Sequence, residues 1–191
     1  LETQWADTRT ELQANADAVN SAAADIAKLN KAIRNNTISG LPANELADQR
    51  DLLVEKITTL TGGVAVRDDD GMVNITMPGT PQGAYLVEGM RSATVQVSGE
   101  STYEDYLAAG GSAAPVTLEW ATDLAGDTMT GTILGGASDL NPKGTMNGQL
   151  AALNQTLPKY LDHLDGIAAQ IAATVNTQPA AGWTTGGDQG E

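Results

Sequence analysis

Large apolar residues recur at every seventh position near the start of the chain. The series is Trp5, Leu12, Val19, Ile26 and Ile33. Seven residues make almost two turns of an α-helix, so these five side chains fall on one stripe of a long helix. A helix with such a stripe needs a partner along its length. The spacing therefore predicts a rod or a coiled-coil-like bundle, although any helical core would also satisfy it.

A second run of apolar residues closes the chain with steps of three and four, which also keep one helix face apolar. It comprises Met146, Leu150, Leu153, Leu157, Leu161, Leu164, Ile167, Ile171 and Val175. We expect helices over 3–35 and 145–175 that pack together along their length and place both chain ends toward one end of a bundle. Pro158 lies inside the second helix, and proline costs about 3 kcal/mol in a helix interior. A kink or a break is therefore expected there.

Residues 44–61 predict a further helix, with Asn44 as its N-cap and Gly62 at its end. Its apolar stripe is Leu46, Leu53, Ile57 and Leu60. The link around Gly40 and Pro42 is short, so this helix should be an antiparallel neighbour of the first.

The apolar period then changes to two, which indicates strands. Val64 and Val66 precede an Asp70-Gly71 pair, and Val73, Ile75 and Met77 follow it, a pattern typical of a β-hairpin. Further strands are expected at 84–87, 93–97, 116–120 and 128–134. The predicted fold is mainly α with a β-rich part: an elongated antiparallel helical bundle with a β-hairpin and a small inserted β subdomain. We assign 1–91 with 140–178 to a discontinuous bundle domain, 92–139 to the insertion and 179–191 to a flexible tail.

Composition restricts the function. The formal net charge of −14 repels phosphate backbones, so nucleic-acid binding is not expected. The chain has no cysteine, which excludes disulfides and thiolate metal sites. No apolar run approaches the ~20 residues that span a bilayer. Phe is absent, and only three Trp and four Tyr occur, which favours a thin, elongated shape. The chain begins at Leu1, and we expect it to be a trimmed piece of a longer protein.

Residues able to carry chemistry are few. His163 is the single histidine and lies between Asp162 and Asp165, so we expect a surface side chain. Asp68-Asp69-Asp70-Gly71 lacks the late glutamate of a calcium loop and reads as a turn. No nucleophile–base pair or metal cluster is visible. We therefore expect no enzyme activity, no catalytic residue, no cofactor, no metal and no small-molecule substrate.

Two blocks of sequence carry a resemblance to a known family. The first is Asp48-Gln49-Arg50-Asp51-Leu52-Leu53 on the second helix, followed by the Gly71 hairpin and Leu86-Val87-Glu88-Gly89. The second runs from Gly148-Gln149-Leu150 to Leu157-Pro158-Lys159-Tyr160-Leu161. Together they resemble the flagellar hook-associated protein 1 family, the hook–filament junction proteins, over about 15–91 and 144–183. The insertion between them shows no such likeness.

This resemblance implies a structural subunit of the bacterial flagellum that is exported, lies outside the cell, and links hook to filament while transmitting torque. Implied partners are further copies, the hook protein, the second junction protein and, through terminal segments missing here, an export chaperone. Two alternatives remain open. One is another flagellar axial protein, such as flagellin or the second junction protein. The other is a secreted helical adhesin or binding module, which a groove with exposed Trp or Tyr within 92–139 would favour.

Overall fold

Two long antiparallel helices form the base of the structure, a computed structural model that describes residues 1–78, 80, 84–129, 131–134 and 144–181. α1 spans Glu2–Ile38 and α2 spans Asn44–Thr61. In the link, Gly40 has φ +69°, a left-handed conformation that glycine tolerates. The predicted N-cap is wrong by one residue. Ala43 is the cap and its carbonyl accepts the Ala47 N–H, so Asn44 is already helical.

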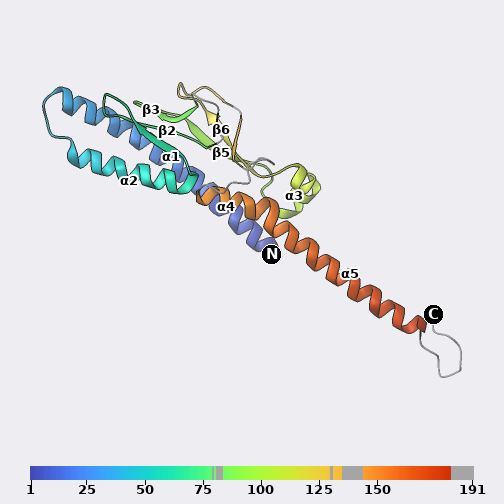
Figure 1. The fold of residues 1–191 in the computed structure, drawn as a ribbon. Coiled ribbons are helices and arrows are strands. Elements are labelled where there is room, and N and C mark those ends of the chain that lie inside the picture. The colour runs from blue at the N-terminus through green and yellow to red at the C-terminus, as the bar shows by residue number, and fades with distance from the viewer. Residues whose placement is uncertain (79, 81–83, 130, 135–143, 182–191) are drawn as a thin grey trace.

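Within the described residues, seven short strands form two antiparallel sheets beside α1 (Figure 1). Their bounds are β1 Val64–Arg67, β2 Val73–Thr76, β3 Tyr85–Glu88, β4 Arg91–Ser92, β5 Thr94–Ser98, β6 Thr117–Thr122 and β7 Thr132–Leu134. The sheet orders are β1-β2-β3-β4 and β5-β6-β7. In the predicted hairpin, Arg67 faces Val73 and Gly71 has φ +76°. Both predicted strands are therefore present. The alternation of buried and less buried residues holds in β2, whereas Val64 and Val66 of β1 are both exposed.

A short helix that the sequence analysis missed follows β5. α3 spans Tyr103–Ala108, and a 3₁₀ turn, η1, follows at Gly111–Ala113. Thr102 caps α3, because its hydroxyl oxygen accepts the Asp105 N–H at 3.2 Å and its hydroxyl donates to the Asp105 carboxylate at 2.7 Å. This reciprocal cap was the available signal. It was overlooked because the Gly-, Ser- and Ala-rich surroundings read as a link.

The closing helix contains a π-helical segment. α4 spans Thr145–Ala151, the π segment η2 spans Ala152–Thr156, and α5 spans Leu157–Ala181. The helix is thus irregular just before Pro158 and then continues through it, rather than ending there. It also runs past the predicted end at residue 175. Residues 182–191 of the predicted tail lie outside the described residues.

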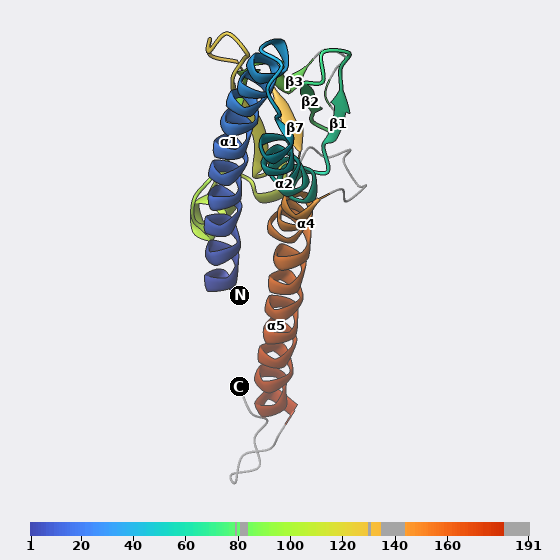
Figure 2. The ribbon, with the colours of Figure 1, turned by 90° about the vertical axis from the view of Figure 1, so that its left-hand side faces the viewer.

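The core lies where α1, α2, α4 and η2 meet the buried faces of the sheets. α1 contributes from Trp5 to Ala27, and the sheets contribute side chains such as Ile75, Leu86 and Leu118. α5 leaves this core and continues well beyond the start of α1, so the described part of the molecule is elongated, and the start of α1 and the end of α5 lie toward the same end of it (Figure 2). In the described part of the chain, no helix has the length and apolar character needed to cross a membrane. The division into a bundle domain, an insertion and a tail stays a prediction.

Candidate functional site

The stripe of α1 faces the interior along its whole length. Trp5, Leu12, Val19 and Ile26 are fully buried, and Ile33 is 9% exposed. In α2, Ile57 is buried, whereas Leu46, Leu53 and Leu60 are half-buried. α2 packs on α1 through one side only, which leaves the edges of its stripe partly open to solvent.

The closing helix is buried at its start and exposed afterwards. Leu150, Leu153 and Leu157 are buried and Leu161 is half-buried. Leu164 and Ile171 are 52% and 60% exposed, so the expectation that they pack against helices of this chain is wrong. α1 starts at Glu2, beside the beginning of α5, and within the described residues no other helix lies along the rest of α5.

We call residues 162–181 of α5 the stalk. Every stalk residue from Asp162 to Thr177 is exposed. Its large apolar side chains are Leu164, Ile167, Ile171 and Val175, and no charged residue follows Asp165 within it. A helix that is apolar or small on nearly every side is normally covered by neighbours. The stalk is therefore the described surface most suited to an assembly contact.

The stalk is joined to the rest of the molecule at the π segment. The Leu157 N–H bonds to the carbonyl of Ala152, five residues back, instead of that of Leu153. In the same register, the Leu153 carbonyl would pair with residue 158, but Pro158 has no N–H. The Trp5 indole N–H donates to this carbonyl instead, at 3.1 Å. The first turn of the chain thus satisfies a buried acceptor 148 residues away.

An aromatic cluster positions Trp5. Its ring centroid lies 5.9 Å from that of Tyr103 and 5.5 Å from that of Tyr106, both on α3. Burial raises the pKa of Tyr103, and the nearby Asp162, Asp165 and Glu2 carboxylates raise it further. Burial also raises the pKa of Tyr106, whose hydroxyl has no hydrogen-bond partner among the described residues. The insertion therefore contacts the first turn of α1 and brings Tyr103 near the carboxylates at the start of the stalk.

The family motif on α2 places one arginine inside the molecule. Arg50 is 1% exposed and donates through Nη1 to the Asn30 side-chain oxygen at 3.2 Å and to the Gly71 carbonyl at 2.9 Å. Its Nε lies 3.4 Å from an Asp51 carboxylate oxygen. Arg50 therefore ties α2 to α1 and to the turn of the β1–β2 hairpin, which explains why motif and hairpin occur together.

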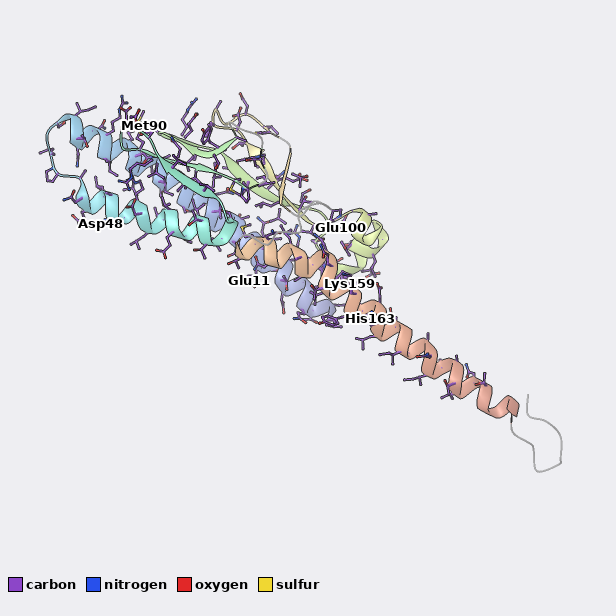
Figure 3. The ribbon with its side chains drawn as sticks, in the orientation of Figure 1. Glu11, Asp48, Met90, Glu100, Lys159 and His163 are labelled. Atoms are coloured by element: carbon purple, nitrogen blue, oxygen red, sulfur yellow. The ribbon has the colours of Figure 1, made fainter. Side chains whose placement is uncertain are left out.

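The other motif residues lie on the surface. Asp48, Gln49 and Asp51 are exposed, and Figure 3 shows Asp48 on the outer side of α2. Asp51 also forms a direct, solvent-exposed ion pair with Arg67 at 3.3 Å. Exposed pairs of this kind contribute about 0–1 kcal/mol. Within the motif, Arg50 and its bond to the Gly71 carbonyl therefore contribute most to holding the fold together.

Three asparagines join helices to strands, and the sequence analysis did not identify this role. Asn30 accepts the Val73 N–H at 3.1 Å and donates to the Val73 carbonyl at 2.9 Å and the Gly89 carbonyl at 2.6 Å. Asn20 likewise donates to the Val95 carbonyl and accepts the Val95 N–H, each at 2.8 Å. Asn154, in the π segment, makes both with Val116 at 2.9 and 2.8 Å. Each primary amide takes the place of a neighbouring strand residue, because it carries one donor and one acceptor side by side.

Gly144, which precedes α4, allows α4 to approach the end of α2. A Cβ at this position would lie 2.6 Å from the carbonyl carbon of Thr61 and 2.7 Å from the Leu60 carbonyl oxygen. Gly144 also has φ +82°. Glycine is required here for both reasons.

The residues set aside on chemical grounds lie where a structural role explains them. His163 is exposed on α5 (Figure 3). Asp68 accepts the Met72 N–H at 2.8 Å and so closes the hairpin turn. Among the described residues, no group of three or more His, Cys, Asp or Glu could hold a metal ion. Tyr103, Tyr106 and Trp120 are buried, so the exposed aromatic groove that would favour an adhesin is not formed by them.

Comparison with known proteins identifies relatives over nearly the whole chain. Residues 1–191 match the family described as "Flagellar hook-associated protein FlgK helical domain". The chain is 32% identical over 182 residues to flagellar hook-associated protein 1 of Escherichia coli (strain K12), covering 93% of this chain and 30% of that protein. It is 30% identical over 177 residues to flagellar hook-associated protein 1 of Salmonella typhimurium, covering 91% and 28%.

A solved structure agrees with these matches. The flagellar hook junction protein FlgK from Burkholderia pseudomallei superposes with a TM-score of 0.66 at 25% identity, covering 98% of this chain and 32% of that one. The chain therefore spans about a third of the length of the relatives that it matches.

Proposed function

This chain belongs to the FlgK helical-domain family of flagellar hook-associated proteins, and we propose that it is the helical part of a structural subunit at the hook–filament junction. The observation that carries the proposal is the family match over all 191 residues. The role is mechanical: the subunit lies outside the cell, joins hook to filament and transmits torque without catalysing a reaction.

The internal bonding supports a load-bearing role. Arg50, Asn20, Asn30 and Asn154 each join elements that are distant in sequence, and their bonds are wholly or partly buried. Cross-links of this kind resist sliding of the sheets along the helices, because sliding would leave several backbone groups without partners at once. A force applied to the sheets is therefore transmitted to α1, α2 and η2 and does not shift the sheets along the helices.

The stalk supports incorporation into a larger assembly. Four large apolar side chains lie exposed on a stretch of helix with no charged residue after Asp165, although the chain as a whole carries a net charge of −14. Burying such surface is worth about 25 cal/mol for each Å² of apolar area removed from water. We propose that the stalk is buried in the junction, with further copies and the neighbouring hook and second junction proteins as partners, and that 92–139 forms an outward-facing subdomain.

The test is genetic. Deleting the full-length gene should give cells that assemble hooks but release unpolymerised flagellin, because filament growth would lack its attachment. Re-expressing the gene should restore filaments, whereas a copy carrying Ile171→Asp in the stalk should restore them poorly. Ser21→Asp, which adds the same charge at an exposed position of α1, is the matched control and should complement fully. Normal motile filaments in the deletion strain would refute the proposal.

A further inference from the structure

The Leu153 carbonyl lies within reach of two competing donors. In a regular α-helix it would accept the N–H of Leu157, four residues on. In the structure the Leu157 N–H bonds to Ala152, and the Trp5 indole bonds to Leu153 at 3.1 Å. The same acceptor can therefore be satisfied in either register, by Trp5 in the π register or by Leu157 in the α register. Neither register leaves this carbonyl unpaired.

Pro158 biases the choice. In an α register its ring would clash with the carbonyl of Asn154, four residues back, and it offers no N–H to that carbonyl. In the π register, the N–H that Pro158 lacks would have bonded to the Leu153 carbonyl, and the Trp5 indole bonds to that carbonyl instead. Both residues thus favour the π register. Pro158 destabilises the α register, and Trp5 bonds to the carbonyl that the π register leaves free.

The two registers differ in the direction that the stalk faces. A π turn holds one residue more than an α turn, so conversion rotates all that follows by about 100°, the angle of one residue. Leu164, Ile167 and Ile171 would then face another side of the molecule. The rotation would turn the buried Leu157 and the half-buried Leu161 away from the core. Side chains from Asp162 to Thr177 are already exposed, so the apolar contacts that change are those of the first turns of α5.

The insertion is connected to this choice. Tyr103 and Tyr106 pack on the Trp5 ring, and Asn154 within the π segment holds both backbone groups of Val116. A shift of the insertion away from α1 would weaken the Trp5 bond and the Asn154 pair together. The position of the insertion and the register of the helix are therefore linked through one carbonyl and one amide.

We propose that η2 is a two-register joint, in which the Trp5 indole holds the π register and its release lets α5 turn by one residue relative to α4. Within a hook–filament junction, such a joint would let identical subunits present the stalk in two orientations. That use rests on the proposed function. The joint itself does not, because it is a property of the isolated chain.

The test measures the distance between two spin labels in solution. The chain has no native cysteine, so labels can be placed at Glu2→Cys on α1 and Asp165→Cys on α5, exposed positions that both lie near Tyr103 and so at a similar level along the molecule. Trp5→Phe keeps an aromatic ring but removes the indole and its N–H donor, and Pro158→Ala restores a helical N–H. A helix with side chains has a radius of about 5–6 Å, so a 100° rotation moves the label by about 8 Å. We expect one distance population in the parent and a second in the double variant.

Trp120→Phe changes a buried tryptophan outside the joint and should leave the single population unchanged. A folded double variant with the parental distribution would overturn the proposal. If the double variant fails to fold, Pro158→Ala alone decides the matter, because it only removes a helix-interior proline. Its Trp5 indole N–H should exchange with solvent at least several-fold faster than in the parent, while the Trp120 indole is unaffected. An unchanged Trp5 exchange rate would likewise overturn the proposal. Neither result bears on the deletion phenotype.

Discussion

Replacing Asn30 with alanine tests whether the buried amide, and not apolar packing alone, joins the sheets to α1. Asn30 is fully buried and uses both side-chain donors and both acceptor positions. Its removal leaves the Val73 N–H, the Val73 carbonyl and the Gly89 carbonyl without their partners, and it removes one bond of Arg50. A buried polar group that loses its partner costs about 1–3 kcal/mol.

The magnitude follows from this count. Three backbone groups at the lower end of that range, together with a bond to a charged group at about 1.5 kcal/mol, give a loss near 4–5 kcal/mol. The better helix propensity of alanine returns at most ~0.7 kcal/mol. We therefore expect Asn30→Ala to lower the free energy of unfolding by about 4 kcal/mol.

Urea unfolding followed by helical circular dichroism provides the measurement, and the urea dependence should be unchanged. Asn35→Ala is the matched control, because Asn35 is exposed on the same helix, and it should change stability by less than about 0.5 kcal/mol. A double-mutant cycle with Arg50→Met should give a coupling of about 1.5–3 kcal/mol. A loss below about 1 kcal/mol for Asn30→Ala would refute the reasoning, since solvent would then be satisfying the freed groups.

Three further expectations concern stability. Gly144→Ala should destabilise by more than about 2 kcal/mol in the same unfolding assay, because the added Cβ meets backbone at a positive φ, whereas Gly148→Ala has open space and should gain about 0.5–1 kcal/mol. Leu153→Ala should cost about 2–5 kcal/mol and Leu164→Ala less than about 1, and equal losses would contradict the exposure of the stalk. Tyr106→Phe should be neutral or stabilising, because its hydroxyl is buried without a partner. Since burial raises the Tyr106 pKa, folding stability should fall as pH rises from the unfolded pKa, about 10, toward the folded value, and Tyr106→Phe should flatten that alkaline decline in a thermal-melt series.

Helices and hairpin could be predicted because each rests on a local pattern. The seven-residue spacing from Trp5 to Ile33 identified α1, and the buried stripe followed from it. Asp70-Gly71 identified the hairpin because Gly71 does adopt a positive φ. In each case the physical cause, helical periodicity or backbone conformation, lies within a few residues of sequence.

The packing of the stalk could not be predicted from its pattern. Leu150, Leu164 and Ile171 share the same spacing, yet the first is buried and the other two are exposed. Periodicity indicates that a helix face is apolar, but it carries no information about which segment covers that face.

The polar cross-links were missed for a different reason. Asn20 and Asn30 lie on α1 between apolar residues, and from the sequence they look like interruptions of the apolar stripe. Asn154 stands out only as part of an Asn-X-Thr sequence. In the structure each amide faces a strand whose backbone groups need partners, so a polar residue is required at that point of the helix face.

This requirement also explains why polar residues such as Asn20 and Asn30 interrupt the apolar face of α1. Where a helix packs on another helix, an apolar side chain serves best, but where it meets the open side of a strand, a leucine would bury an unpaired N–H and C=O at about 1–3 kcal/mol each. Asn30 bonds to both backbone groups of Val73, to the Gly89 carbonyl and to Arg50. These four hydrogen bonds outweigh the one apolar contact that a leucine would make at this position. The asparagines are therefore the residues that fix the sheets at defined positions along α1, and the apolar stripe alone would leave that position undetermined.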